Sequence, residues 1–553
     1  MAMAVVLLAS CSGKLGQLSS DYFKVNPNPL ESDAGQVTAT IDGTFPEKYM
    51  NKKAVVKVTP ELRFTKNGVE QSMKGQPAIF QGEKVMGNNQ TISYAMGGHY
   101  TMKTSFPYEE AMQKSNLWLT FDATIGKKMV EVPAVKVANG VIATSELYHR
   151  TLSQSQGSLA QDGFQRVVAQ KQQANIKFLI QQAELRKSEL KNGSVQEFVE
   201  LLKRISADRQ GLNLNNVEVS AYASPDGGFA LNEKLANKRQ QNTENYVKQQ
   251  MKQAQLDQPV EASYTAQDWE GFQQLVAASN IQDKDVILRV LSMYKDPEER
   301  EQQIKNMSAG FRELADGILP ELRRARLTIN YETVGRDDQQ IQQQFKEDAS
   351  KLSVEELLYA ATLTDNAAEK ETIYKKTASL FSNDVRAYNN LAALAWQQGD
   401  YAKVQTLLNQ ARAIDATSPE VNANLGLLAL QQGDVQMAEN YLGKAANACN
   451  LAEALGNLHL AQGNYALAAQ DLAGVASNSA GLAQLLTKDY AKAAETLKAV
   501  KNGDGMTDYL QAIVCARQGN DSMASYFLRQ AVEKDPSLAA YLTNDLELRN
   551  VSK

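Results

Sequence analysis

Trp396-Gln-Gln-Gly-Asp-Tyr401 is a turn that recurs along the C-terminal third of the sequence. Leu430-Gln-Gln-Gly-Asp-Val435 and Leu460-Ala-Gln-Gly-Asn-Tyr465 repeat it, and their glycines place the copies 34 and then 30 residues apart. Shorter copies follow at Lys488-Asp-Tyr490 and Gln518-Gly-Asn520. A turn that recurs at this period predicts a stack of helix pairs, in which each pair buries its apolar face against the next.

The residues around these turns resemble the tetratricopeptide repeat (TPR), a helix-pair repeat of about 34 residues. The Leu-Gly pair of that family falls on Leu425-Gly426 and Leu455-Gly456, and Pro536 stands at its closing proline. A small residue recurs where the two helices of a pair touch, at Ala438, Ala468, Ala493 and Ala524. The resemblance implies an all-α TPR solenoid over residues 340–553, whose groove docks an outer-membrane or periplasmic protein partner.

A middle region mixes strands and helices around the stretch Val217-Glu-Val-Ser-Ala-Tyr-Ala-Ser-Pro-Asp-Gly-Gly-Phe-Ala-Leu-Asn-Glu-Lys-Leu-Ala-Asn-Lys-Arg239. The pattern predicts a strand, a turn and a long polar helix. This stretch resembles the OmpA-like family of β/α/β/α/β domains, with Gly227, Asn232, Leu235 and Arg239 at the matching positions. The resemblance implies an OmpA-like domain over residues 149–335, with a helical insert at about 267–322.

OmpA-like domains hold outer-membrane proteins to peptidoglycan, and the resemblance implies a site that grips the diaminopimelate of the stem peptide. A zwitterionic group needs a cation for its carboxylate and an anion for its ammonium. The candidate peptidoglycan-binding residues are Ser224, Asp226, Asn232 and Arg239. Ser224 stands at the family's aspartate position and carries no charge, and Asp226 replaces it only if the loop is rebuilt. For Arg239, a solvated helix charge or an internal salt bridge is the alternative.

Residues 31–148 have the pattern of an all-β domain. Alternating segments such as 36–42, 54–59 and 117–121 are separated by turn signals that include Asn67-Gly68. Short strands at this spacing predict an immunoglobulin-like β-sandwich. We expect Trp118 to belong to its core, and the pattern assigns the sandwich no function.

The first residues carry a targeting signal. Residues 1–11 form a short apolar run that ends in Leu8-Ala-Ser-Cys11, and a polar linker follows over 12–30. This resembles the lipobox of bacterial lipoproteins, which implies cleavage before Cys11 and lipid attachment to its thiol. The run lacks a positively charged n-region, so we expect further residues upstream of Met1. Acyl chains would anchor the protein stably, and Ser12-Gly-Lys14 favours a periplasm-facing anchor, with the cell surface as the alternative.

Composition excludes several function classes. The net charge of -5 does not suggest a nucleic-acid partner. The histidines and the cysteines, three of each, lie far apart and form no metal-ligand spacing, so we expect neither a metal nor another cofactor. The acidic pairs Glu109-Glu110, Glu298-Glu299 and Asp337-Asp338 read as solvated surface. Motifs of hydrolases and phosphate-binding loops are lacking, so no catalytic residue is expected and an enzyme, such as a hydrolase, is disfavoured.

Together these patterns predict a multidomain α+β protein with a β-sandwich, an OmpA-like domain and a TPR solenoid. The combination resembles outer-membrane lipoproteins of Bacteroidota. The leading interpretation is a lipid-anchored outer-membrane scaffold, whose TPR array docks a protein partner and whose OmpA-like domain is directed to peptidoglycan. The alternative is a component of an outer-membrane assembly or secretion complex, in which a degenerate OmpA-like domain serves only for protein docking.

Overall fold

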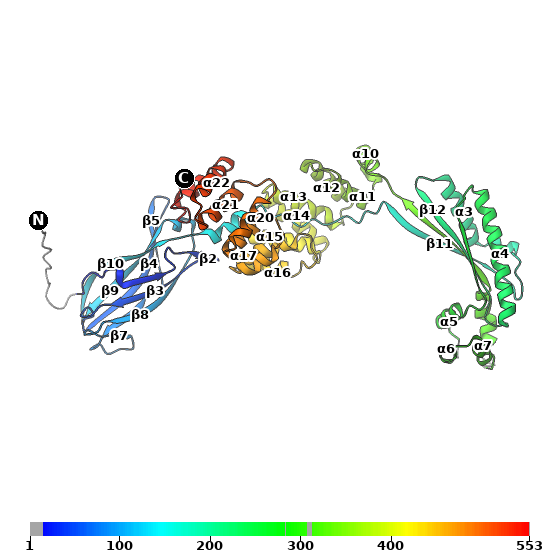
Figure 1. Ribbon diagram of the computed structural model, residues 1–553, viewed down its shortest axis with the longest axis horizontal. Helices are drawn as coiled ribbons and strands as arrows, with labels where there is room; N and C mark the ends of the chain where they lie inside the picture. The colour runs from blue at the N-terminus through cyan, green and yellow to red at the C-terminus, as the bar shows by residue number, and fades with distance from the viewer. Residues whose placement is uncertain (1–14, 282–283, 307–311, 552–553) are drawn as a thin grey trace. The chain divides into compact units, whose positions relative to one another are not determined.

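The computed structural model describes residues 15–281, 284–306 and 312–551 (Figure 1). Cys11 lies outside this range. The chain forms two compact units, of which the first combines Met1–Asp162 with Thr364–Lys553 and the second is Gly163–Leu363. These limits differ from the expected domain boundaries, because residues 149–162 belong with the helical repeats and residues 340–363 with the middle region. The contacts of residues 153–162, described below, explain the first difference.

The N-terminal part of the first unit is a pair of β-sheets. In one sheet, β3 (Gln36–Phe45) pairs with β1 (Phe23–Asn26), β2 (Ser32–Asp33) and β8 (Gly98–Pro107). The other sheet has the order β10-β9-β4-β6-β7, with β5 also on β4. Its strands are β4 (Ala54–Lys66), β5 (Val69–Lys74), β6 (Ala78–Gly82), β7 (Gln90–Ile92), β9 (Ser115–Ile125) and β10 (Lys128–Gly140). The Asn67-Gly68 turn, with positive φ at both residues, joins β4 to β5 as the sequence predicts.

Alternation along the strands gives the two sheets one shared core. Val37 and Ile41 of β3 pack in the same cluster as Val58 of β4 and Leu117 of β9. The expectation that Trp118 belongs to this core is wrong. Trp118 alternates with the buried residues of β9 and therefore lies on the outer face of its sheet, where it is half-buried.

The C-terminal part of the first unit is a series of helix pairs. The turn glycines Gly399, Gly433, Gly463 and Gly519 all have positive φ, and Lys488 takes this conformation in the shortened fourth copy. The helices from the first turn onward are α13 (Val385–Gln397), α14 (Tyr401–Ile414), α15 (Pro419–Gln431), α16 (Val435–Leu442), α17 (Leu451–Ala461), α18 (Tyr465–Asp471), α19 (Asn478–Leu486), α20 (Tyr490–Lys498), α21 (Gly505–Arg517), α22 (Asp521–Lys534) and α23 (Leu538–Asn544). α12 (Ala367–Leu380) precedes them. One continuous core joins these pairs, as expected for stacked repeats.

The second unit is a four-stranded sheet with helices. The strand order is β11-β14-β12-β13, for β11 (Val167–Lys177), β12 (Leu212–Tyr222), β13 (Val260–Thr265) and β14 (Arg324–Val334). β12 and β13 are parallel, and the other neighbours are antiparallel. The helices α3 (Gly193–Ala207) and α4 (Phe229–Gln253) share the core of the sheet. The insert between β13 and β14 contains α5 (Trp269–Ala278), α6 (Lys284–Met293), α7 (Pro297–Asn306) and α9 (Leu319–Leu322).

Candidate functional site

The helical repeats of the first unit hold a segment of their own chain. The short helix α1 (Tyr148–Leu152) contributes Tyr148 and Leu152 to the repeat core. Residues 153–162, here called the linker segment, then run across the first helices of successive repeats. Trp396 of α13 donates its Nε1–H to the Ser155 carbonyl at 2.8 Å. The linker segment therefore lies on the face where we expected a partner protein to dock.

Two asparagines bind the backbone of the linker segment in the same way. Asn424 of α15 accepts a hydrogen bond from Ser158 N–H at 2.7 Å and donates one to the Ser158 carbonyl at 2.8 Å. Asn390 of α13 repeats this arrangement with Ala160, at 2.8 Å and 2.9 Å. Each carboxamide thus satisfies both backbone groups of one residue, a pairing that requires an extended backbone but no particular side chain.

The pattern continues toward the C-terminal repeats. Glu453 of α17 accepts a hydrogen bond from Gln156 N–H at 3.2 Å, and Asn457 donates to the Ser155 hydroxyl at 2.9 Å. Burial raises the pKa of Glu453, and hydrogen bonds from Gln156 N–H and the Ser477 hydroxyl oppose the shift. Successive repeats therefore hold alternate residues of the linker segment. The order along the chain is reversed, because α13, α15 and α17 hold Ala160, Ser158 and Gln156, respectively.

Gly157 lies in close contact with the repeats. A Cβ atom at this position would lie 3.1 Å from both Ala393 Cβ and Asn424 Oδ1. Contacts this short oblige the neighbours to move. A glycine between the residues that Asn424 and Glu453 hold lets the backbone lie directly on α13.

These asparagines were not predicted from the sequence as binding residues, although a signal for them was present. Asn390 and Asn424 each stand nine residues before a turn glycine, so they are equivalent positions of successive repeats. Polar residues that recur inside an otherwise apolar first helix mark a recognition surface. In the third copy the equivalent residue is Ala454, and the neighbouring Glu453 provides the contact instead.

The predicted site residue Arg239 is fully buried in the second unit, at 0 % exposure. Its guanidinium donates to the carbonyls of Gln182 at 2.9 Å, Tyr222 at 2.8 Å and Leu179 at 3.3 Å, and lies over the ring of Phe178. Burial lowers its pKa to about 10, and the nearby Arg323 charge adds to this shift. Arg239 is thus neither a solvated charge nor half of a salt bridge, and its donors are directed at backbone.

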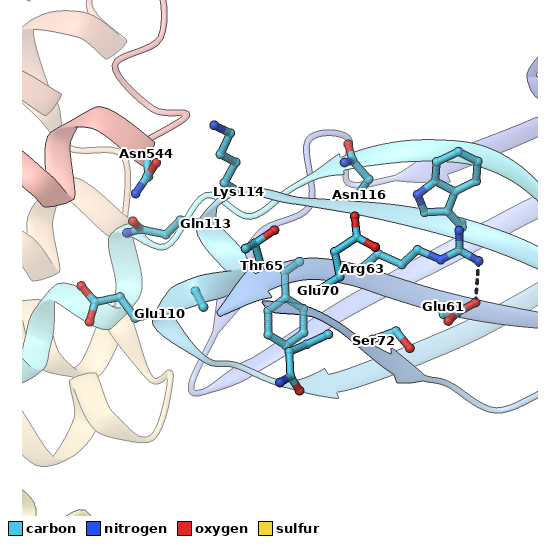
Figure 2. A pocket seen from close by; sticks show the side chains of 14 residues that line it. Glu61, Arg63, Thr65, Glu70, Ser72, Glu110, Gln113, Lys114, Asn116 and Asn544 are labelled. Carbon is cyan, nitrogen blue, oxygen red and sulfur yellow. Dashed lines mark hydrogen bonds and ion pairs between the residues drawn. The ribbon is translucent and has the colours of Figure 1, made fainter. Parts of the chain in front are cut away.

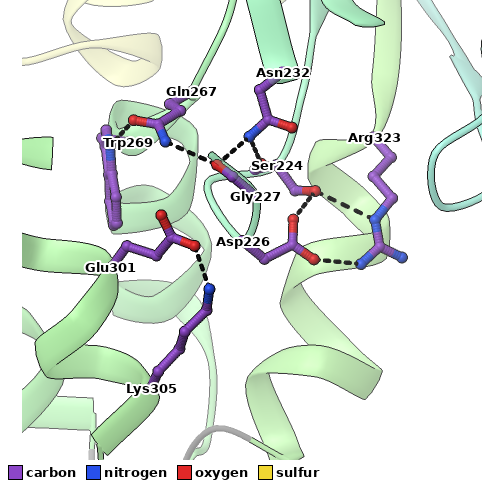
Figure 3. A network of polar contacts seen from close by, with 9 residues as sticks. All are labelled: Ser224, Asp226, Gly227, Asn232, Gln267, Trp269, Glu301, Lys305 and Arg323. Carbon is purple, nitrogen blue, oxygen red and sulfur yellow. Dashed lines mark hydrogen bonds and ion pairs between the residues drawn. The ribbon is translucent and has the colours of Figure 1, made fainter. Parts of the chain in front are cut away.

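The other predicted residues form a separate network at the turn after β12 (Figure 3). Arg323 donates to the Asp226 carboxylate at 3.0 Å and to the Ser224 hydroxyl at 3.3 Å, and that hydroxyl donates to Asp226. Asn232 donates to the carbonyls of Ser224 and Gly227 at 2.9 Å and 2.8 Å. Arg323, which the sequence analysis did not name, therefore supplies the counter-charge for Asp226.

The helical insert closes over this turn. The cavity between Asp226, Trp269 and α7 has a volume of about 10 Å³ and is lined also by Phe272, Leu314 and Leu319. Space on this scale holds about one water molecule. The structure brings Ser224, Asp226 and Asn232 together, but it directs their polar atoms, and those of Arg239, at the protein itself.

A larger hollow of about 800 Å³ lies on the outer face of the two-sheet region (Figure 2). Arg63 lies over the ring of Trp118, at 5.0 Å from its centroid, and donates to Glu61 at 2.9 Å. Burial would raise the pKa of Glu61, but hydrogen bonds from Arg63 and Ser72 outweigh it and lower that pKa. The hollow is open and polar, so it suits a polar ligand better than an apolar one.

The residues that the structure describes contain no group of three or more His, Cys, Asp or Glu side chains placed to hold a metal ion. Within the same residues, no helix has the length and hydropathy to cross a bilayer.

Comparison with known proteins gives matches among solved structures but none among family models or curated sequences. Solved structures that it resembles include a tetratricopeptide repeat protein from Parabacteroides merdae (13% identity, TM-score 0.29, covering 45% of this chain and 98% of the other). YrrB, a TPR protein with an unusual peptide-binding site (15%, 0.19, 37% and 98%), and PilW, a type IV pilus biogenesis factor (17%, 0.26, 37% and 98%), are others.

All three TM-scores are below 0.5, so the repeats are better defined by the chain's own features. Those features are the recurring turn glycines, the helix pairs that they join and the continuous core between the pairs.

Proposed function

We propose that this protein is a non-enzymatic scaffold, anchored in the outer membrane by a lipid on Cys11, that docks a protein partner through its helical repeats. The observation that carries the proposal is the recognition of backbone by Asn390 and Asn424. These side chains hold an extended segment of the chain as a TPR array would hold a peptide. The repeats are thus built for binding, and in this protein one face holds the linker segment that leads into the second unit.

The second helices of the repeats offer a surface for a partner. Met437 of α16, Leu467 of α18 and Met523 of α22 each stand four residues after a turn glycine, and each is exposed by more than 40%. Exposed apolar side chains that recur at one repeat position indicate an interaction surface more strongly than scattered ones do. We assign the partner to this surface because the first helices are covered.

For the second unit, the geometry favours the docking alternative over peptidoglycan binding. Asp226 is neutralised by Arg323, and the guanidinium of Arg239 is occupied by carbonyl groups. A stem peptide would have to displace these contacts and the insert. Binding to peptidoglycan therefore stays a prediction, supported by the spacing of Gly227, Asn232, Leu235 and Arg239.

Site-specific photo-crosslinking in cells tests the scaffold proposal. A photoreactive residue at Leu467 is expected to yield one adduct with an envelope protein. The same residue at the exposed Ala466 of α18, about 100° away around the helix, is expected to yield little. Adducts of equal yield at both positions, or none at either, would reject the docking surface. Replacing Cys11→Ser tests the anchor separately, since it should move the protein from the membrane to the soluble periplasmic fraction.

A further inference from the structure

One end of the two-sheet region gathers four loops that face away from its core. The loop over 46–53 is hydrogen-bonded to each of the others. Lys48 N–H donates to Tyr94 O at 2.7 Å, Lys84 N–H to Lys52 O at 2.7 Å, and Gly126 N–H to Lys53 O at 3.0 Å. We call this surface the loop end and define it by residues 46–53, 83–89, 93–97 and 126–129.

The loop end has the most exposed large apolar side chains in the described part of the chain. Met86 is exposed by 98%, Met96 by 82% and Met129 by 79%. Side chains exposed to this degree bury almost no apolar surface, so they contribute little to the stability of the fold. Their grouping on three linked loops therefore points to a surface that an apolar or interfacial partner covers.

The same loops carry a strong positive charge. Six exposed lysines stand against two glutamates, Glu47 and Glu83, although the whole chain has a net charge of -5. The lysines are Lys48, Lys52, Lys53, Lys84, Lys127 and Lys128. Lysines around protruding apolar side chains suit a bilayer surface, where ammonium groups meet phosphates and apolar groups enter the headgroup region.

The chain also enters the β region at this end. Tyr49 donates its hydroxyl hydrogen to Gly16 O at 2.7 Å, and Phe23 of β1 pairs with Gly43 near the end of β3. Cys11 precedes Leu15 by four residues, which span at most about 14 Å when extended. A lipid on Cys11 would thus hold the loop end close to the membrane from which the chain departs.

We infer that the loop end is a membrane-contact surface, which binds the phosphate headgroups of an anionic bilayer through its lysines and inserts its methionines between them. The inference goes beyond the docking of a protein partner. The proposed acylation of Cys11 would strengthen the contact, but the contact itself does not require the acyl chain. Each lysine near an anionic surface strengthens binding by about fivefold, so several acting together give measurable binding without an anchor.

Co-sedimentation of unacylated protein with vesicles tests this inference separately from the proposed anchor. Protein beginning at Ser12 keeps every residue that the structure describes. It is mixed with vesicles of phosphatidylcholine alone or with phosphatidylglycerol added. We expect sedimentation only with the anionic vesicles, and we expect high salt to weaken it, because salt screens exposed charges.

Two variants and a matched control make the test specific. Replacing Lys48, Lys53, Lys84 and Lys127 by Gln is expected to weaken binding at least tenfold, and replacing Met86, Met96 and Met129 by Ser is expected to weaken it further. The control replaces four exposed lysines of the same region outside the loop end, Lys74, Lys103, Lys114 and Lys136, by Gln. Circular dichroism verifies that each variant is folded.

Three results would overturn the inference. They are failure of the unaltered protein to sediment with anionic vesicles, equal sedimentation with neutral ones, and an equal loss in the control variant. Binding to a soluble polyanion such as heparin without binding to vesicles would assign the lysines to a different ligand, and it also counts against a membrane contact.

Discussion

Asn390 and Asn424 lie 34 residues apart at equivalent positions of two helical repeats, and each forms two hydrogen bonds with the backbone of one residue in the linker segment. The bound residues, Ala160 and Ser158, are two apart, as the alternation of an extended chain requires. One step from repeat to repeat thus corresponds to a step of two residues along the linker segment.

Removal of one of these asparagine side chains should lower the free energy of unfolding of the first unit. Asn424→Ala leaves the buried N–H and C=O of Ser158 with fewer partners, so we expect a loss of about 2 kcal/mol in unfolding free energy. Asn440→Ala, at an exposed position of α16, serves as the control and should change it by less than about 0.5 kcal/mol. Urea unfolding of both variants measures the difference. Equal effects would contradict a stabilising role for the hydrogen bonds between Asn424 and Ser158.

A side chain at position 157 should displace the linker segment. Gly157→Leu places atoms where Ala393 and Asn424 lie, whereas Gln156→Leu places the same leucine side chain at an exposed neighbouring position. We expect limited proteolysis within residues 153–162 to be at least tenfold faster in Gly157→Leu than in the parent protein. Resistance equal to that of Gln156→Leu would mean that the segment does not lie against α13.

The C-terminus of the repeats should respond to acid through Glu547. Burial would raise the pKa of Glu547, but its hydrogen bonds with Arg517, both at 2.9 Å, outweigh this and lower that pKa below its ordinary value of 4.5. The folded state then takes up the proton less readily than the unfolded state. Its contribution to stability is present above pH 4.5 and is lost as the pH falls through the folded pKa.

A variant isolates this contribution. Arg517→Met leaves the partly buried Glu547 without its counter-charge and should cost about 3 kcal/mol at pH 7. The cost should shrink as the pH falls below 4.5, because the carboxyl group then becomes neutral. Thermal unfolding at pH 7 and pH 4 measures both, and a cost that does not change with pH would contradict the role given to the ion pair.

Arg239 should prove essential for the fold of the second unit. Arg239→Met removes the donors for three carbonyl groups in a fully buried position, so we expect a loss of at least about 3 kcal/mol. Lys238→Met, an exposed charge on the same helix, should have little effect. Hydrogen exchange of α3 and β12 reads out the second unit alone. If Arg239→Met keeps full protection there, the side chain is available for a ligand instead.

The sequence predicted the local elements better than their partners. Positive φ at Gly399 and Gly433 follows from turn chemistry, so the helix pairs were predictable from single residues. Trp118 was misplaced because alternation along a strand does not identify which face is buried until the other sheet is known. The contacts of Arg239 could not be predicted from its own helix either, because its acceptors Leu179 and Gln182 lie more than 50 residues away in sequence.

The linker segment was missed for a different reason. Its residues are small or polar except for Leu159, and nothing in residues 153–162 indicates a strand or a helix. Only the asparagines of the repeats, more than 200 residues further along the chain, give it a structure. An extended segment bound through its backbone leaves almost no pattern in its own sequence.

Residue-resolved hydrogen exchange of the linker segment tests the central claim most directly. In the intact protein, the amides of Gln156, Ser158 and Ala160 donate to Glu453, Asn424 and Asn390. We therefore expect them to exchange at least a hundredfold more slowly than in an unstructured peptide of the same sequence, and we expect Asn390→Ala with Asn424→Ala to abolish the protection of Ser158 and Ala160. Exchange of these amides at the rate of the free peptide would contradict the claim that the repeats hold their own linker.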